Sequence, residues 1–137
     1  MLIELGVSDL ALLERVRVSL GPGLTILTGE TGAGKSLLID ALLLVLGGRA
    51  ESALLRAGAT TARVEALFER LPEPLIAVRE LSASGRSVAR LDDETVTAAR
   101  LAATISPLVE IHGQHEQQRL LSPTYQLELL DAFGALA

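Results

Sequence analysis

The residues best suited to chemistry form one short glycine-rich stretch. It reads Gly29-Glu30-Thr31-Gly32-Ala33-Gly34-Lys35-Ser36 and fits the phosphate-binding pattern of Gly, any four residues, then Gly-Lys-Ser/Thr. Glycines at these positions let backbone N–H groups come close to phosphate oxygens. Lys35 can then reach the β and γ phosphates of a nucleotide, and the Ser36 hydroxyl can ligate Mg²⁺. The helix that follows turns its positive end toward the same anion, and Leu37 lies at its start. The stretch together with Leu37 therefore predicts a nucleotide site at residues 29–37.

The segments on either side of this stretch are those that a phosphate loop requires. Residues 24–28 form an apolar run that predicts a central strand buried on both faces. Residues 37–43 predict a helix, which should end at Gly47-Gly48. Lys35 is the only lysine in the chain, and every other basic residue is arginine. The chain therefore uses lysine where a compact point charge is needed.

Composition limits the remaining possibilities. The chain has 137 residues, 49% of them hydrophobic, which is enough for one folded domain but short for a complete nucleotide-hydrolysing enzyme. Its net charge of -5 gives no overall basic surface, so any DNA contact requires a local arginine patch. There are no cysteines, which excludes disulfides. The longest apolar stretch, 41–46, is too short to cross a bilayer, so we expect a cytoplasmic protein with no membrane contact.

Hydrophobic periodicity predicts the other elements. Alternating or apolar runs indicate strands at 2–7, 15–20, 62–69, 75–82, 87–91 and 108–111. Helices are predicted at 51–57, from a Thr97 cap to Ile105, and from Ser122-Pro123 onward. Asp92-Asp93 should form a turn. Together these segments predict an antiparallel sheet beside the nucleotide-binding strand.

A second polar cluster follows the predicted strand at 108–111. It contains His112, Gln114, His115, Glu116 and Gln117. Three interpretations compete: a metal site formed by His112 and His115, a solvated polar loop, or a loop whose glutamine reaches Mg²⁺ and the attacking water. We prefer the third, because this cluster occurs beside a phosphate loop in one small domain.

Several of these runs together resemble one known family. Residues 29–42, 46–50 and 111–117 resemble the N-terminal head segment of RecN, a family of bacterial SMC-like DNA repair ATPases. The resemblance extends over essentially the whole chain. It implies an α/β fold, the N-terminal lobe of a P-loop ABC/SMC-type ATPase head, with a strand-loop-helix core and an antiparallel β flank. Residues 1–121 would form this lobe, and 122–137 would begin a helix leading toward a coiled-coil arm.

The resemblance also implies roles for individual residues. Lys35 and Ser36 would hold ATP and Mg²⁺, and Gln114 would be the Q-loop residue that contacts the metal and assists hydrolysis. Related heads place a glutamine immediately before the loop glycine, where this chain has His112, so His112 is the alternative sensing residue. The implied partners are the C-terminal lobe of the same protein, a second head that sandwiches ATP in a homodimer, and DNA. The implied location is the cytoplasm, with association to the nucleoid on DNA damage.

Two elements of such a head are missing from the sequence. A Walker B strand needs about four apolar residues followed by Asp-Glu, and in the nearest segment, 88–94, Arg90 interrupts the apolar run. Residues 81–85 only imitate the Leu-Ser-Gly-Gly signature. We therefore expect a half-head that binds ATP and, alone, hydrolyses it very weakly or not at all. The alternatives are a small stand-alone P-loop kinase or NTPase, and an ATP-dependent structural tether without hydrolysis.

Overall fold

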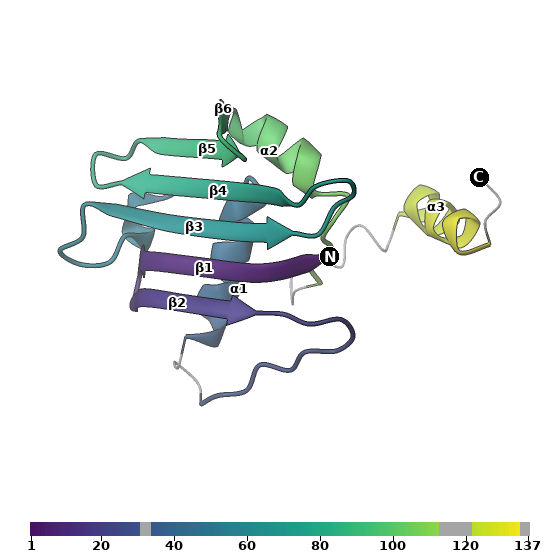
Figure 1. Ribbon diagram of the computed structural model, residues 1–137, viewed down its shortest axis with the longest axis horizontal. Helices are drawn as coiled ribbons and strands as arrows, with labels where there is room; N and C mark the ends of the chain where they lie inside the picture. The colour runs from purple at the N-terminus through teal and green to yellow at the C-terminus, as the bar shows by residue number, and fades with distance from the viewer. Residues whose placement is uncertain (31–33, 113–121, 135–137) are drawn as a thin grey trace.

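The computed structural model, described here for residues 1–30, 34–112 and 122–134, is built on a six-stranded antiparallel sheet (Figure 1). The strand order is β2-β1-β3-β4-β5-β6. The strands are β1 (Leu2–Leu10), β2 (Leu13–Ser19), β3 (Thr61–Phe68), β4 (Leu75–Ser82), β5 (Ser87–Leu91) and β6 (Glu94–Val96). The helices are α1 (Lys35–Val45), the short 3-10 helix η1 (Ser52–Leu54), α2 (Ala98–Ile105) and α3 (Pro123–Gly134). The predicted antiparallel sheet is confirmed.

The sheet has one buried face because its strands alternate apolar and polar residues. In β3, Ala62, Val64, Ala66 and Phe68 are buried while the residues between them are partly exposed. Helices α1 and α2 pack on that face and contribute Ala41, Leu44, Val45, Leu101 and Ile105 to the same core. The opposite face carries no helix in the described part of the chain (Figure 1). The domain is thus a two-layer structure with an open outer sheet face.

The end of α1 matches the predicted glycine stop. Gly47 has a φ of 94° and its N–H donates to the Leu44 carbonyl at 3.2 Å, while the Gly48 N–H donates to the Leu43 carbonyl at 2.9 Å. This paired arrangement closes a helix with a left-handed residue, which glycine adopts without steric cost. A Cβ on Gly47 would lie 2.6 Å from the Ala102 Cβ. Gly47 therefore also allows α1 and α2 to approach each other closely.

One buried charge lies beneath the C-terminal end of α1. Arg79 of β4 is only 5% exposed and donates from Nε to the Ser87 hydroxyl at 2.8 Å. It also points Nη1 at the Leu44 carbonyl, 3.5 Å away, at the negative end of the helix dipole. Burial lowers the pKa of the Arg79 guanidinium from its usual value. Arg79 links two strands to α1 through neutral acceptors.

The prediction of a central strand at residues 24–28 is wrong for this structure. These residues form no strand, and the side chains of Leu24, Ile26 and Leu27 are 88%, 72% and 50% exposed. A strand buried on both faces needs neighbouring strands and a covering layer. Within the described residues, the sheet ends at β2 and offers neither to this segment. The apolar run lies uncovered along the lower edge of the molecule (Figure 1).

Two other local predictions need correction, and one short strand was missed. Residues 108–111 form no strand, because Pro107 follows α2 in a turn and no described strand lies beside them. The helix predicted at 51–57 is only the three-residue η1. The short strand β6 was not predicted, since three residues carry too little periodicity to be recognised. The Thr97 cap is confirmed, with its hydroxyl accepting from the Arg100 N–H at 3.1 Å.

The last described helix differs from the others. α3 begins directly after Ser122, as predicted, and has no buried side chain. Leu127, Leu130 and Phe133 are 58%, 66% and 93% exposed. Within the described residues, no helix combines the length and hydrophobicity needed to cross a membrane. The apolar side chains of α3 are left largely exposed to solvent in this structure.

Candidate functional site

The candidate nucleotide site lies at the N-terminal end of α1. Gly34 precedes the helix with a φ of 93°, a conformation that favours glycine. Among the described residues, no side chain caps the first turn of α1, and this turn contains no acidic residue. The backbone N–H groups of this turn and the positive end of the helix dipole suit an anion. These properties fit a phosphate group.

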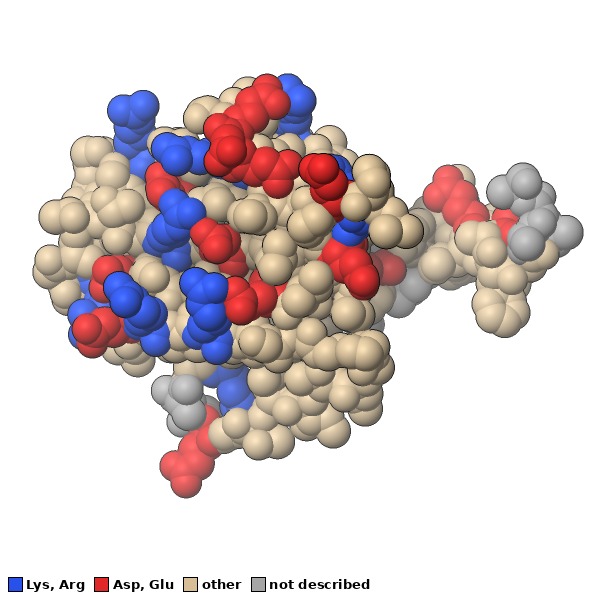
Figure 2. Space-filling view, viewed as in Figure 1, with Lys and Arg blue, Asp and Glu red and all other residues tan. Residues whose placement is uncertain are grey.

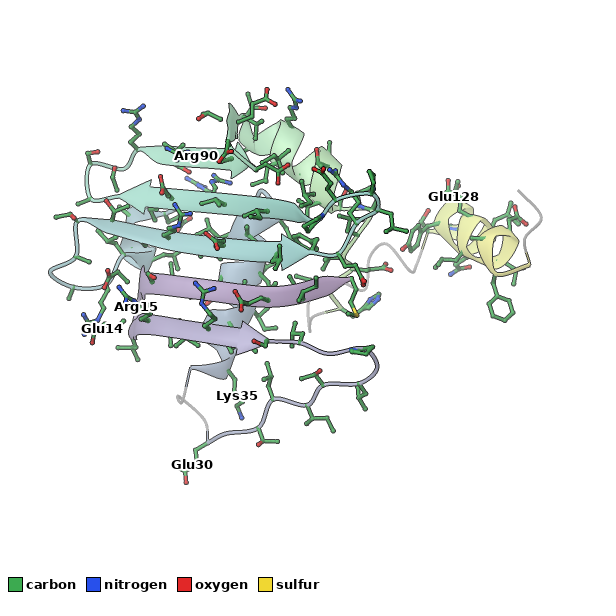
Figure 3. All side chains as sticks on the ribbon, in the orientation of Figure 1. Glu14, Arg15, Glu30, Lys35, Arg90 and Glu128 are labelled. Atoms are coloured by element: carbon green, nitrogen blue, oxygen red, sulfur yellow. The ribbon has the colours of Figure 1, made fainter. Side chains whose placement is uncertain are left out.

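Lys35 is the first residue of the helix and is exposed. Its ammonium group donates a hydrogen bond to the carbonyl oxygen of Gly29, at the other side of the loop. Figure 3 shows Lys35 extending from the start of α1 toward the segment that leads to Glu30, which points away at the tip. The lysine thus spans the two ends of the phosphate-binding pattern, where it can exchange the carbonyl oxygen for a phosphate oxygen.

The structure describes only part of the predicted contact set. Glu30 and Ser36 are exposed, and Leu37 lies in the first turn of the helix. The Ser36 hydroxyl accordingly remains accessible to a cation. The predicted contacts at Thr31, Gly32 and Ala33 lie outside the described residues. The assignment of residues 29–37 as the nucleotide site stays a prediction with which the described geometry is compatible.

The second predicted cluster is described only at its beginning. The His112 imidazole is half exposed, and its Nε2 lies 3.8 Å from a Glu110 carboxylate oxygen. The other oxygen of Glu110 accepts a hydrogen bond from the hydroxyl of Tyr125 in α3. Gln114, His115, Glu116 and Gln117 lie outside the described residues. Among the described contacts, none joins His112 to the phosphate loop, so the sensing role of Gln114 or His112 stays a prediction.

The segment that imitates a Walker B element is a hairpin. Strand β5 ends at Leu91, and Asp92 turns the chain with a φ of 52°. The Asp92 carboxylate accepts a hydrogen bond from the Ile76 N–H at 2.9 Å, and its own N–H donates to the Ile76 carbonyl at 2.7 Å. This aspartate therefore stabilises the turn. Residues 81–85, which imitate the signature sequence, likewise form the end of β4 and its hairpin.

The described residues at the start of α1 carry groups that suit an anion. Among the residues described here, these groups are the Lys35 ammonium, the Ser36 hydroxyl and the N–H groups of the first turn of α1. In the part of the chain that the structure describes, no group of three or more His, Asp or Glu side chains could hold a metal ion. Ser36 alone would supply one Mg²⁺ ligand, with the others coming from phosphate, water or residues elsewhere. The described arrangement is compatible with the predicted P-loop, whose assignment stays a prediction.

Comparison with known proteins identifies the class. Residues 9–119 match the AAA domain family, and the chain belongs to that family. It is 40% identical over 151 aligned residues to the DNA repair protein RecN of Bacillus subtilis, covering 98% of this chain and 26% of that protein. It is 37% identical to the RecN of Vibrio cholerae, covering 100% and 28%. The chain thus corresponds to the N-terminal segment of RecN and spans about a quarter of the length of these relatives.

Solved structures confirm the predicted lobe. One SMC ATPase structure, from work on ATP-driven dimerization and DNA-stimulated activation, matches with a TM-score of 0.74 and 22% identity, covering 95% of this chain and 97% of that one. The SMC head domain from Thermotoga maritima matches with a TM-score of 0.67 and 24% identity, covering 75% and 41%. The fold is the N-terminal lobe of an SMC-type ATPase head.

Proposed function

We propose that this chain is the ATP-binding half of an SMC-like DNA repair ATPase head and that hydrolysis requires a C-terminal lobe. The proposal depends mainly on Lys35, which is the only lysine in the chain. Its ammonium group donates to the Gly29 carbonyl across the loop, beside the N-terminal end of α1. Lys35 and the loop N–H groups would hold the phosphates of ATP. Ser36 would supply a ligand for Mg²⁺, which would neutralise charge on the transferred phosphoryl group.

The uncovered run at residues 24–27 supports a two-part head. Leu24, Ile26 and Leu27 are largely exposed and lead directly into the phosphate loop. Exposed apolar patches of this kind mark contact sites, because burying apolar surface drives association. The C-terminal lobe of the same protein would cover this run and fix the loop. It would also bring the acidic pair and the signature segment that this chain lacks.

A head made of two lobes also implies how the complete protein would assemble. Two heads would sandwich ATP in a homodimer, and hydrolysis would separate them. Residues 122–137 would lead from the lobe at 1–121 into a coiled-coil arm, which would give the exposed apolar residues of α3 a partner helix. DNA would be engaged by the complete cytoplasmic protein.

Reconstitution from separate segments tests the proposal. Phosphate release should stay near background for the 137-residue chain and should rise by orders of magnitude when the C-terminal segment is added. Lys35→Ala should abolish the increase, which excludes a contaminating ATPase.

Two outcomes would contradict the proposal. Turnover by the isolated chain that depends on Lys35 would favour a small stand-alone kinase or NTPase. ATP binding without any turnover by the combined segments would instead favour a structural tether.

A further inference from the structure

Helix α1 is anchored to the rest of the lobe near its C-terminal end. Its buried residues are Ala41, Leu44 and Val45, and none lies among residues 35–40. The start of α1 lies about 14 Å from Leu44 along the helix axis. A tilt of about 5° about the anchored end would move this start by about 1 Å. The placement of the predicted phosphate site therefore depends on how firmly the C-terminal end of α1 is held.

Among the described residues, one side-chain hydrogen bond joins this end of α1 to the sheet. Nη1 of Arg79 in β4 donates to the Leu44 carbonyl oxygen at 3.5 Å. The same oxygen accepts from the Gly47 N–H at 3.2 Å, but that bond lies within the helix end. Apolar packing is not directional, so it leaves the tilt of a helix weakly defined. The contact from Arg79 supplies a direction that the apolar core does not.

Arg79 is itself held in one orientation. Its Nε donates to the Ser87 hydroxyl of β5 at 2.8 Å, and the residue is only 5% exposed. The guanidinium group is a planar fork, so a bond from one edge fixes where the other nitrogens point. A lysine ammonium group has no such rigid geometry. The Ser87 hydroxyl therefore aims the guanidinium group at the end of α1.

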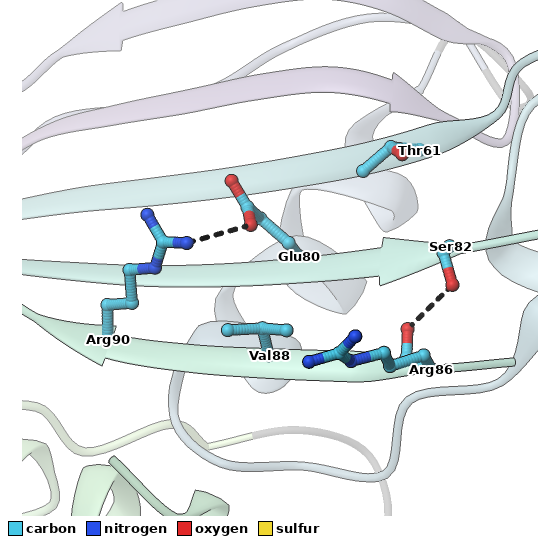
Figure 4. A pocket seen from close by; sticks show the side chains of 6 residues that line it. All are labelled: Thr61, Glu80, Ser82, Arg86, Val88 and Arg90. Carbon is cyan, nitrogen blue, oxygen red and sulfur yellow. Dashed lines mark hydrogen bonds and ion pairs between the residues drawn. The ribbon is translucent and has the colours of Figure 1, made fainter. Parts of the chain in front are cut away.

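The surroundings of Arg79 argue against a role that is only space-filling. None of the ion pairs among the described residues includes Arg79. Glu80, the next residue of β4, lies on the opposite face of the sheet, where it pairs with Arg90 (Figure 4). Figure 2 shows acidic and basic side chains interspersed over that face. Burying a charge without a counter-ion is costly, and an apolar side chain would fill this space at lower cost. The bonds of Arg79 thus explain an arginine here better than its volume does.

The other end of α1 tolerates little displacement. A Cβ on Gly34 would lie 3.3 Å from Cδ2 of Leu13 in β2, so the start of the helix already lies close to that strand. The Lys35 ammonium group also has to reach the Gly29 carbonyl across the loop. Contacts to a bound substrate depend steeply on placement, and a shift of about 1 Å can remove much of their effect. Loss of the contact from Arg79 would thus be felt at the predicted phosphate site.

We propose that Arg79 is a positioning residue for nucleotide binding. By holding the C-terminal end of α1 against β4, it fixes Lys35 and the N–H groups of the first turn at the opposite end of the helix. Arg79 would touch no part of the nucleotide and would act through α1 alone. The inference rests on the proposed function, since it assumes that these groups bind the phosphates of ATP.

Calorimetric titration of the full-length protein with ATP and ADP, well below the unfolding temperature of each variant, tests the inference. Arg79→Met should weaken binding of both nucleotides about fivefold or more, because the displaced first turn contacts phosphates that they share. A variant that is only less stable would keep the parent affinity under these conditions, so a merely structural role predicts no change. Arg90→Met is the matched control, since it removes the same charge from the outer face of β5. It should change affinity by less than about twofold.

Ser87→Ala provides a second test that keeps the buried charge. Ser87 is exposed, so the fold should tolerate the change, and this variant tests the inference even if Arg79→Met does not fold. Without the hydroxyl, the guanidinium group is no longer aimed at the Leu44 carbonyl, and ATP should bind about twofold to threefold more weakly. Adding Ser87→Ala to Arg79→Met should have no further effect, because the two residues act through one contact.

Three results would overturn the inference. Parent-like ATP affinity of both Arg79→Met and Ser87→Ala would show that the contact has no bearing on the site. Equal losses in Arg79→Met and Arg90→Met would show that only net charge matters. Additive losses in the double variant would show that Arg79 and Ser87 act separately. Failure of the parent protein to bind ATP would instead contradict the proposed function, on which the inference depends.

Discussion

In the proposed nucleotide site, Lys35 would be the one lysine available to contact phosphate. No other lysine exists in the chain, and the bond from Lys35 to the Gly29 carbonyl places its charge across the loop. An arginine fork at this point would be larger and differently hydrated, so the neighbouring arginines cannot take over its role. The nucleotide affinity of the protein should therefore depend on this one ammonium group.

The first prediction concerns how strongly ATP affinity depends on Lys35. Lys35→Ala should weaken ATP binding by the full-length protein by roughly 30-fold to 1000-fold, since a charge-assisted contact in a partly dry site is worth roughly 2–4 kcal/mol. Calorimetric titration measures the change. Arg70→Ala removes an exposed cation elsewhere and should leave the affinity unaltered. Equal ATP affinity of Lys35→Ala and the parent protein would contradict the assignment.

The backbone around Lys35 could be predicted from the sequence because its pattern is local. A phosphate loop is defined by consecutive residues, and the left-handed Gly34 and the helix starting at Lys35 follow directly from that pattern. The outer sheet face around Arg15 could not be predicted in the same way. The alternation of Arg15 and Arg17 with valines indicated an outward face, but Gly6 and Arg63 join that face only through strand pairing between distant segments.

At the scale of elements, the close contact between α1 and α2 depends on Gly47, which has no Cβ. Gly47→Ala would force a left-handed φ on alanine and place its Cβ 2.6 Å from the Ala102 Cβ and 2.8 Å from the Ala98 carbonyl oxygen. We predict a loss of roughly 2–4 kcal/mol in the free energy of unfolding. Denaturant titration by circular dichroism measures it.

A second glycine supplies the control for this prediction. Gly85 has a φ of 82° in the β4–β5 hairpin, and a Cβ at this position would meet open space, with no atom beyond its chain neighbours within 4 Å. Gly85→Ala should cost only about 1 kcal/mol, the conformational part of the effect. Equal losses at the two positions would show that the helix contact at Gly47 is unimportant.

Arg79 gives a further prediction for the packing between β4 and α1. Arg79→Met keeps much of the volume and removes the cost of burying a charge, so stability should stay within about 1 kcal/mol of the parent or increase. Arg79→Ala leaves a cavity and should cost roughly 2–4 kcal/mol. Thermal and denaturant unfolding measure both changes. Strong destabilisation by Arg79→Met would mean that the bonds to Ser87 and the Leu44 carbonyl are essential.

The strands differ in how well the sequence specified them. β4 and β5 agree with the predicted bounds, because each has its own apolar pattern and a clear hairpin turn between them. The segment 24–28 was predicted as a strand from hydrophobicity alone. Hydrophobicity shows only that burial of the segment would be favourable, and no strand of the described sheet pairs with it.

At the scale of the whole molecule, the uncovered run predicts a defect in assembly. Ile26→Asp should make the isolated chain less prone to self-association, because it interrupts an exposed apolar patch. The same change should reduce ATPase reconstitution with the C-terminal segment by about tenfold or more, since it places a charge in the contact. Sedimentation velocity and phosphate release measure the two effects.

Leu71→Asp is the matched control for this prediction. Leu71 is 91% exposed between β3 and β4, and the substitution adds the same charge away from the run. Reconstitution should be unaffected by it. If Ile26→Asp and Leu71→Asp reconstitute equally well, residues 24–27 do not contact the C-terminal segment.

The strand order has a consequence for how the protein is made. All neighbouring strands are consecutive in sequence except β1 and β3, so most of the sheet can form from local hairpins as the chain leaves the ribosome. Pairing of β1 with β3 then closes residues 20–60, which include the predicted phosphate loop, into a connection that the sheet holds at both ends. The sheet is complete at Val96, early in a chain whose relatives are about four times longer. In a protein as long as these relatives, the folded sheet would expose the apolar run at residues 24–27 until later segments are synthesised.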